Sequence, residues 1–128
     1  MITVLIVGGI IALFNMIADM LNGYGVLSLL SNALNAIPFI GKQDLGQGIA
    51  YGLIEITRGC FIISQRPLVT FSFALTAMVI AFGGASIAIQ SIAFLGKCKI
   101  RAISYITRKL TQSLITFLIA LGIGYLII

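Results

Sequence analysis

Three polar side chains stand inside long apolar stretches, which is where a residue that binds a solute within a membrane would have to lie. Glu55 lies deep in the apolar segment 45–57, and Ser86 and Gln90 lie four residues apart in the uncharged run 67–96. A carboxylate isolated in lipid is costly, so Glu55 is expected to face protein or water. Such side chains can hydrogen-bond a polar solute or couple its passage to a cation or proton.

Glu55 and Thr57 also have purely structural interpretations. Arg58 lies three residues after Glu55 on the same helical face, where it can pair with the carboxylate and steady the helix end. The Thr57 hydroxyl either satisfies the local backbone or lines a site beside Glu55. The sequence leaves these alternatives open. One acid cannot serve as both acid and base of a hydrolase, so we expect no enzyme and no catalytic residue.

The pair Gly83-Gly84 interrupts the uncharged run near its middle. A helix made of the whole run 67–96 would be about 45 Å long, beyond the roughly 30 Å hydrocarbon core of a bilayer. The pair either allows close packing or a kink, or it unwinds the helix and exposes backbone groups. We favour the second interpretation, in which a new helix begins near Ser86 and offers its positive end to a polar or anionic solute, with Gln90 on the same side.

The composition is that of a membrane protein. Of 128 residues, 60% are apolar and 9% are charged, whereas soluble domains carry roughly 25% charged residues. The net charge is +5, but the cations are few and stand at the ends of apolar runs. We therefore expect them to contact lipid headgroups and set the orientation, rather than to bind nucleic acid.

The sequence predicts neither a metal site nor a cofactor. It contains no His, which excludes a His-ligated metal. Cys60 and Cys98 fit no metal-ligand spacing; we interpret them as small apolar residues, while a disulfide stays open. Walker-type and other glycine-rich phosphate loops are absent, so nothing favours an ATPase.

The first half of the chain predicts one span followed by shorter helices. Residues 2–21 form a retained first span, in which Asn15 and Asp19 either approach the interface or face a polar cavity. A helix over 26–37 is too short to cross and is closed by Pro38.

A helix over 45–57 follows, again shorter than a full span. Asp44 is its expected N-cap, with Gln47 as capping-box partner. Gly48 and Gly52 in this helix allow another helix to approach closely. The triplet 58–60 is expected to interrupt it.

The second half contains the broken helix and the last span. Pro67 is expected to be the first helical residue of the arm 68–81, and the second arm is 86–95. The basic residues from Lys97 to Arg101 begin an interfacial stretch that leads into the last span, 110–128. By the positive-inside rule the Lys97–Arg101 loop is cytoplasmic and the C-terminus points outward.

Two motifs resemble a known family. The segment 52–60, Gly-Leu-Ile-Glu-Ile-Thr-Arg-Gly-Cys, followed by the segment 82–90, Phe-Gly-Gly-Ala-Ser-Ile-Ala-Ile-Gln, resembles the second half of the sporulation integral membrane proteins of the YlbJ type. That family belongs to a group that carries the nucleoside-transporter gate domain. The chain departs from it in length, since it covers one of two such halves, and in having Ile87-Ala88-Ile89 where a His-like residue is expected.

The resemblance implies a multi-pass protein of the cell membrane of a Gram-positive, spore-forming bacterium. It implies transport of a small polar or anionic solute, such as dipicolinic acid or a nucleoside, and a second half supplied by a homodimer or a separate chain. The expected fold is an all-α integral membrane protein: about three full transmembrane helices plus half-length and broken helices, one half of an inverted-repeat transporter. We expect the whole chain, 1–128, to form one such domain.

We expect the solute site to be lined by six residues: Glu55, Thr57, Gly83, Gly84, Ser86 and Gln90. The alternative is a non-transporting subunit, or a truncated copy, that assembles with or regulates a partner membrane protein through the Gly48/Gly52 face.

Overall fold

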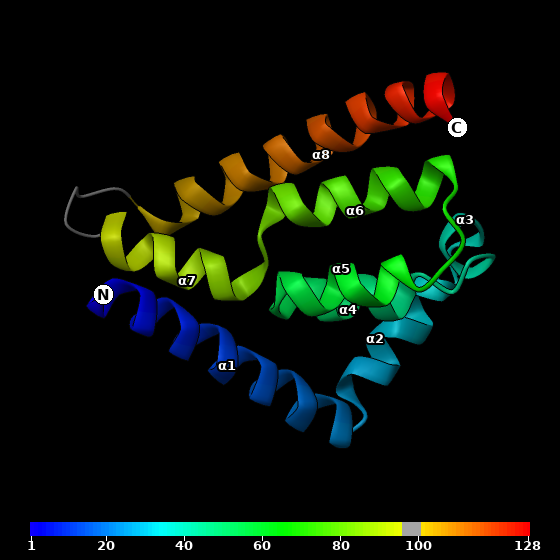
Figure 1. The fold of residues 1–128 in the computed structure, drawn as a ribbon. Coiled ribbons are helices and arrows are strands. Elements are labelled where there is room, and N and C mark those ends of the chain that lie inside the picture. Colours follow the sequence, from blue (N-terminus) through cyan, green and yellow to red (C-terminus); the bar gives the residue numbers. More distant parts are fainter. Residues whose placement is uncertain (96–100) are drawn as a thin grey trace.

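Every regular element in the described parts of the chain is a helix. The computed structural model describes residues 1–95 and 101–128 (Figure 1). The helices are α1 (Ile2–Gly23), α2 (Val26–Asn35), α3 (Pro38–Gly41), α4 (Gly46–Ile54), α5 (Ile56–Ser64), α6 (Thr70–Phe82), α7 (Gly84–Leu95) and α8 (Ala102–Ile127). Three segments are long and apolar enough to cross a membrane: Ile2–Gly23, Thr70–Ala93 and Ala102–Ile127. The predicted all-α membrane fold with three spans and shorter helices is confirmed at this level.

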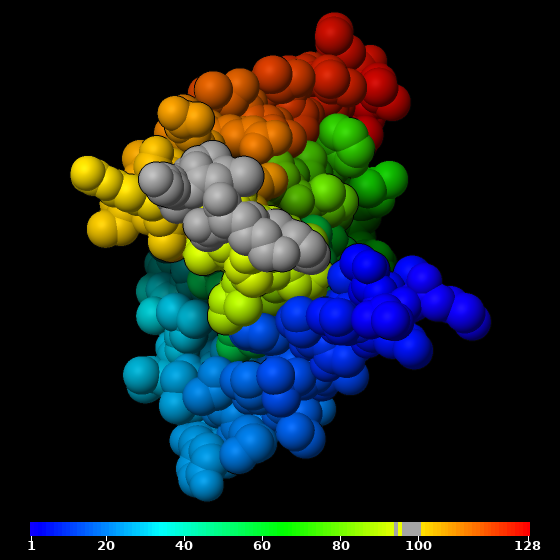
Figure 2. All heavy atoms as spheres, turned by 90° about the vertical axis from the view of Figure 1, so that its left-hand side faces the viewer, coloured from blue at the N-terminus to red at the C-terminus, as the bar shows by residue number. Residues whose placement is uncertain are grey.

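The three spans run between two ends of the molecule. The start of α1, the end of α7 and the start of α8 lie at one end, which faces the viewer in Figure 2. The short helix α3 and the C-terminus lie at the other end (Figure 1). Lys97, Cys98 and Lys99 fall outside the described residues, so the cytoplasmic position of their loop stays a prediction.

The last span, α8, packs antiparallel against α6 (Figure 1). Its inner face carries Ser113, Ala120 and Gly124, which are all buried. A Cβ atom at Gly124 would lie 2.7 Å from the Thr70 methyl group, so the small residue sets the approach of the two helices. The helix begins at Ala102, so residues 102–109 are continuous with the last span. The interfacial position predicted for these residues stays a prediction.

Helices α4 and α5 form a hairpin rather than one longer helix. Each has nine residues and is about 14 Å long, half of the hydrocarbon core. A Cβ atom at Gly59 would lie 2.5 Å from the Gly52 nitrogen and 2.8 Å from the Gly48 oxygen, so glycine backbones of the two helices touch. The close helix approach predicted at Gly48 and Gly52 is confirmed, but the partner is α5 of the same chain. The predicted helix over 45–57 with an interruption at 58–60 is wrong, because the turn falls at Glu55.

The N-terminus of α4 is capped from a distant residue. The Asn35 side-chain oxygen accepts the Gly46 backbone N–H at 2.9 Å, and its amide donates to Asp44 at 2.8 Å. Arg66 pairs with the other Asp44 oxygen at 2.5 Å. The predicted capping box of Asp44 and Gln47 is therefore wrong, because Asp44 is used to hold Asn35 and Arg66.

The start of α6 also differs from the prediction. The helix begins at Thr70, so Pro67 is not its first residue. The Ser72 hydroxyl oxygen accepts the Val69 backbone N–H at 3.0 Å and fixes the first turn. Pro67 instead belongs to the link between α5 and α6, where its carbonyl lies 3.1 Å from the same hydroxyl.

Candidate functional site

Glu55 forms the tip of the α4–α5 hairpin. Its backbone is extended, with φ −139° and ψ 117°, which ends α4 and begins α5. The carboxylate accepts the backbone N–H groups of Thr57 at 3.2 Å and Arg58 at 3.0 Å, and it also accepts the Thr57 hydroxyl. Its side chain is completely buried. Glu55 is thus the N-cap of α5, and its negative charge stands at the positive end of that helix.

The Arg58 guanidinium does not pair with Glu55. It contacts the Asp19 carboxylate of α1 at 2.5 Å and stacks on the Tyr51 ring, 4.6 Å from the ring centre. The structural alternative in which the Glu55 and Arg58 side chains pair is therefore wrong, because only the Arg58 backbone reaches Glu55. Asp19 instead links α1 to the hairpin, while the Asn15 amide donates to the Ile11 carbonyl of its own helix at 3.1 Å.

The predicted break at Gly83 and Gly84 is present. Both residues have positive φ, +86° and +67°, a region that glycine adopts without strain. The second arm begins at Gly84, two residues before the predicted start at Ser86. The segment Thr70–Ala93, which is long and apolar enough to cross a membrane, therefore consists of two helices joined at Gly83.

The two breaks meet inside the protein. A Cβ atom at Gly84 would lie 2.7 Å from the Gly52 carbonyl oxygen and 3.3 Å from that of Ile54. These carbonyls belong to the last turn of α4, where no further helical turn follows to bond them. The start of α7 thus touches the end of α4, directly beside the residue that caps α5. Figure 1 shows the tip of the hairpin pointing at the step between α6 and α7.

The six predicted site residues group around this junction in two sets. Glu55 and Thr57 are bonded to each other on the hairpin, although Thr57 is otherwise exposed. Ser86 is completely buried, and its hydroxyl oxygen lies 3.4 Å from the half-buried Gln90 amide nitrogen. Gly83 and Gly84 connect the sets, because Gly84 lies against the hairpin. Within the described residues, no hydrogen bond joins the Glu55 pair directly to the Ser86 pair.

Lys109 contributes to the junction and was missed by sequence reasoning. Its ammonium group donates to the Ala81 carbonyl at 3.2 Å, in the last turn of α6 before the break. A cation at that position complements the negative end of a half-length helix. In the sequence, Lys109 falls in the interfacial stretch predicted between the Lys97–Arg101 loop and the last span. The sequence does indicate that a broken helix leaves backbone carbonyls that need a hydrogen-bond donor. Only the antiparallel packing of α8 on α6 shows that Lys109 is the donor that reaches them.

Replacing Lys109 by Met is expected to lower the free energy of unfolding by about 1 kcal/mol, because the Ala81 carbonyl loses its charged donor. Chemical unfolding of the purified protein in lipid bicelles measures the change. Lys42→Met is the control, since Lys42 is exposed at the end of α3. Equal stability of the two variants would contradict the capping role of Lys109.

The junction is closed in this structure, and apolar grooves flank it. One groove, of about 230 Å³, is lined by Gly52, Leu53 and Phe82 among others, and a second, of about 340 Å³, by Leu53, Phe82 and Gly84 among others. Neither Glu55 nor Ser86 has exposed surface. A solute that reaches these side chains therefore requires the hairpin tip and the start of α7 to separate.

The polar groups of the junction suit a solute with both donors and acceptors. The end of α4 offers carbonyl oxygens, and the start of α7 offers backbone N–H groups. Across residues 1–95 and 101–128, no group of three or more His, Cys, Asp or Glu side chains is placed to hold a metal ion. Cys60 is a half-buried free thiol.

Comparisons of the chain with protein-family models, with curated proteins and with solved structures found no match. The resemblance to sporulation membrane proteins therefore stays a prediction from two sequence motifs, and the junction of two broken helices is the feature on which a functional proposal rests.

Proposed function

We propose that the chain is one half, or one subunit, of a small-solute membrane transporter of the inverted-repeat type. The observation that carries this proposal is the meeting of two chain breaks. One lies at Glu55 between two half-length helices, and the other at Gly83-Gly84 within a segment long enough to cross a membrane. Irregular backbone at membrane depth is tolerated where it is buried in protein or lines a cavity, and in transporters such breaks bind the solute. A protein that only anchors a partner has no need of two breaks.

In this proposal the solute is polar or anionic, such as dipicolinate or a nucleoside, and it binds between the hairpin tip and the start of α7. The N–H groups after Gly84 and the Ser86 and Gln90 side chains meet its acceptors. A dianion is compatible with Glu55, because the carboxylate already accepts three hydrogen bonds from the start of α5. Opening of the junction exposes the site alternately to the two sides of the membrane.

Uptake into proteoliposomes tests the proposal. The protein, purified with any membrane partner that accompanies it, is expected to accumulate labelled dipicolinate or uridine. Ser86→Ala is expected to reduce uptake about tenfold, the effect of losing one hydrogen bond to a solute. Ser104→Ala, an exposed hydroxyl at the start of α8, is the control and is expected to leave uptake unchanged.

The uptake measurements test the site assignment and the transport function separately. If uptake occurs but both Ser86→Ala and Glu55→Gln leave it unchanged, the site assignment is wrong. If neither solute is taken up, a non-transporting subunit is favoured. That alternative then needs another docking surface than the Gly48/Gly52 face, because α5 covers those glycines.

A further inference from the structure

The outward face of α8 carries a regular seam that no other part of the described chain covers. Its residues recur at spacings of four and three: Arg108, Gln112, Ile115, Ile119, Gly122 and Leu126. All six are exposed, and nothing lies within 4 Å of a Cβ atom built on Gly122. This is the heptad spacing by which two helices pack with their side chains interdigitated. The seam lies opposite the inner face of α8, which packs on α6.

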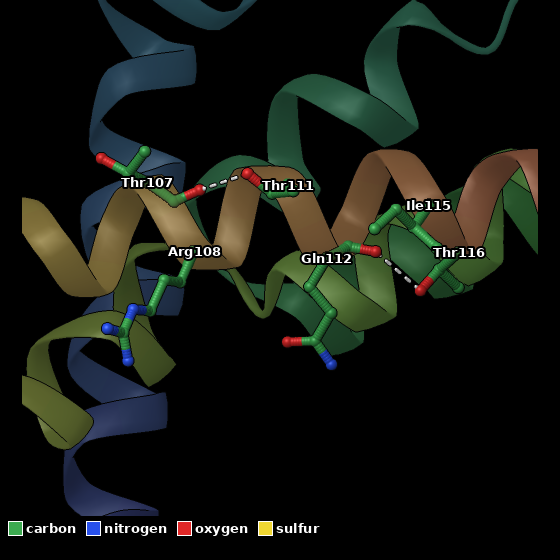
Figure 3. Close-up of a pocket in the computed structure, with 6 residues that line it drawn as sticks. All are labelled: Thr107, Arg108, Thr111, Gln112, Ile115 and Thr116. Carbon is green, nitrogen blue, oxygen red and sulfur yellow. Dashed lines mark hydrogen bonds between the residues drawn. The ribbon is translucent and has the colours of Figure 1, made fainter.

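Gln112 makes the seam unsuited to lipid. Figure 3 shows Gln112 and Arg108 projecting from the same side of α8, along a shallow groove of about 390 Å³. The neighbouring threonines bond their own helix: Thr111 donates to the Thr107 carbonyl at 3.0 Å, and Thr116 to the Gln112 carbonyl at 2.9 Å. Among the described residues, none bonds the Gln112 side-chain amide. An amide in the hydrocarbon region without a partner is costly.

We propose that the α8 seam binds the same seam of a second copy of this chain, forming a parallel dimer about a twofold axis normal to the membrane. Because both copies then have the same orientation, this dimer does not supply the inverted half of the proposed transporter, which would come from a separate chain. An amide is both donor and acceptor, so two symmetry-related Gln112 side chains satisfy each other. Five of the eight Lys and Arg residues lie between positions 97 and 109, which gives both copies the same orientation and the same Gln112 depth.

The acidic side chains already have partners within the chain. The two copies are therefore expected to join through the Gln112 amides rather than through an ion pair. Asp19 is paired with Arg58, Asp44 with Arg66, and Glu55 caps α5. No Asp or Glu side chain in residues 1–95 and 101–128 is therefore left to meet Arg108 across the seam. Arg108 lies one turn closer than Gln112 to the start of α8, and its side chain reaches the lipid phosphates at that end. Gly122 allows close approach of the backbones further along.

Disulfide crosslinking in native membranes tests this interface independently of transport. In a background with Cys60→Ala and Cys98→Ala, Ile119→Cys is expected to form a crosslinked dimer on oxidation, and Leu114→Cys is not. The two side chains have matched exposure, 57% and 59%, but Leu114 faces away from the seam. Equal crosslinking at both positions, or crosslinking at neither, would overturn the proposal.

Gln112→Leu tests the amide pair itself. We expect the association constant of fluorescently labelled protein in lipid vesicles to fall about 3- to 20-fold, the range for interhelical hydrogen bonds in membranes. Gln47→Leu, which changes an exposed amide on α4, is the matched control and should leave association unchanged. If Gln112→Leu associates as strongly as the control, Gln112 does not join the copies.

Discussion

Gly59→Ala is expected to be among the most destabilising single substitutions in this chain. Its new methyl group would overlap the backbone of α4, 2.5 Å from the Gly52 nitrogen and 2.8 Å from the Gly48 oxygen. Backbone atoms of a packed helix cannot yield as a flexible side chain does, so the hairpin must open. Overpacking of this kind costs about 3 kcal/mol, more than the roughly 1 kcal/mol that Ala gains over Gly within a helix.

Chemical unfolding in bicelles, followed by circular dichroism, measures this loss. Gly9→Ala is the matched control, because a Cβ atom at Gly9 in the middle of α1 meets nothing within 4 Å. That control is expected to be neutral or slightly stabilising, since it brings helix propensity without a clash. If Gly59→Ala were as stable as Gly9→Ala, the result would contradict the close backbone contact between α4 and α5.

Glu55→Ala is expected to have the second large effect, through the start of α5. The substitution removes the acceptor of two backbone N–H groups and one hydroxyl, and all three would lose their partner beside a buried turn. Loss of an N-cap costs up to about 2 kcal/mol in water, and each buried donor left unpaired costs about 1–3 kcal/mol. We expect a total loss of about 2–4 kcal/mol in the free energy of unfolding.

Glu55→Gln removes the charge and one of the two acceptor oxygens. The Thr57 N–H bonds one carboxylate oxygen, and the Arg58 N–H and the Thr57 hydroxyl bond the other. A glutamine keeps only one of these oxygens, so its loss of stability should be smaller than that of Glu55→Ala, about 1–2 kcal/mol. The same unfolding assay compares the two variants. If both variants were as stable as the unchanged protein, the carboxylate would not hold the hairpin tip, and Glu55 would then be free for another role.

The closed junction gives the same residues a structural role and the proposed transport role. Glu55 holds the hairpin tip together, and the tip covers Ser86 and the start of α7. In the proposed transporter, the hairpin moves as one unit with its cap intact, so the hydrogen bonds within α5 survive each cycle. The Arg58–Asp19 pair then marks the contact between α1 and the hairpin that such a motion must carry along or break.

Much of the fold follows from local properties of the sequence. The three spans were predictable because the length of an apolar run sets what can cross a bilayer. The break at Gly83-Gly84 was predictable for a similar reason, because two adjacent glycines in an over-long run can adopt positive φ at little cost. The association of Gly48 and Gly52 with a close helix contact also follows from residue size alone.

The helix ends were decided by contacts between residues far apart in the chain. Asp44 has the sequence context of an N-cap, yet Asn35 caps α4 because the packing of α2 on α4 brings its side chain there. Glu55 is not among the preferred capping residues, and the sequence left open whether it pairs with Arg58 or lines a solute site. Arg58 instead pairs with Asp19 in α1, a partner that no spacing along the sequence predicts.

The sequence by itself therefore determined the membrane environment, the three spans, the glycine break and the polar residues available for a site. Hydropathy, length and glycine content act locally, and local effects can be read along one chain. Only the tertiary structure decided that the chain turns at Glu55, that Gly84 lies against the end of α4, and that Lys109 bonds the end of α6. Each of these depends on which helix faces meet, and that choice is made by packing the whole chain at once.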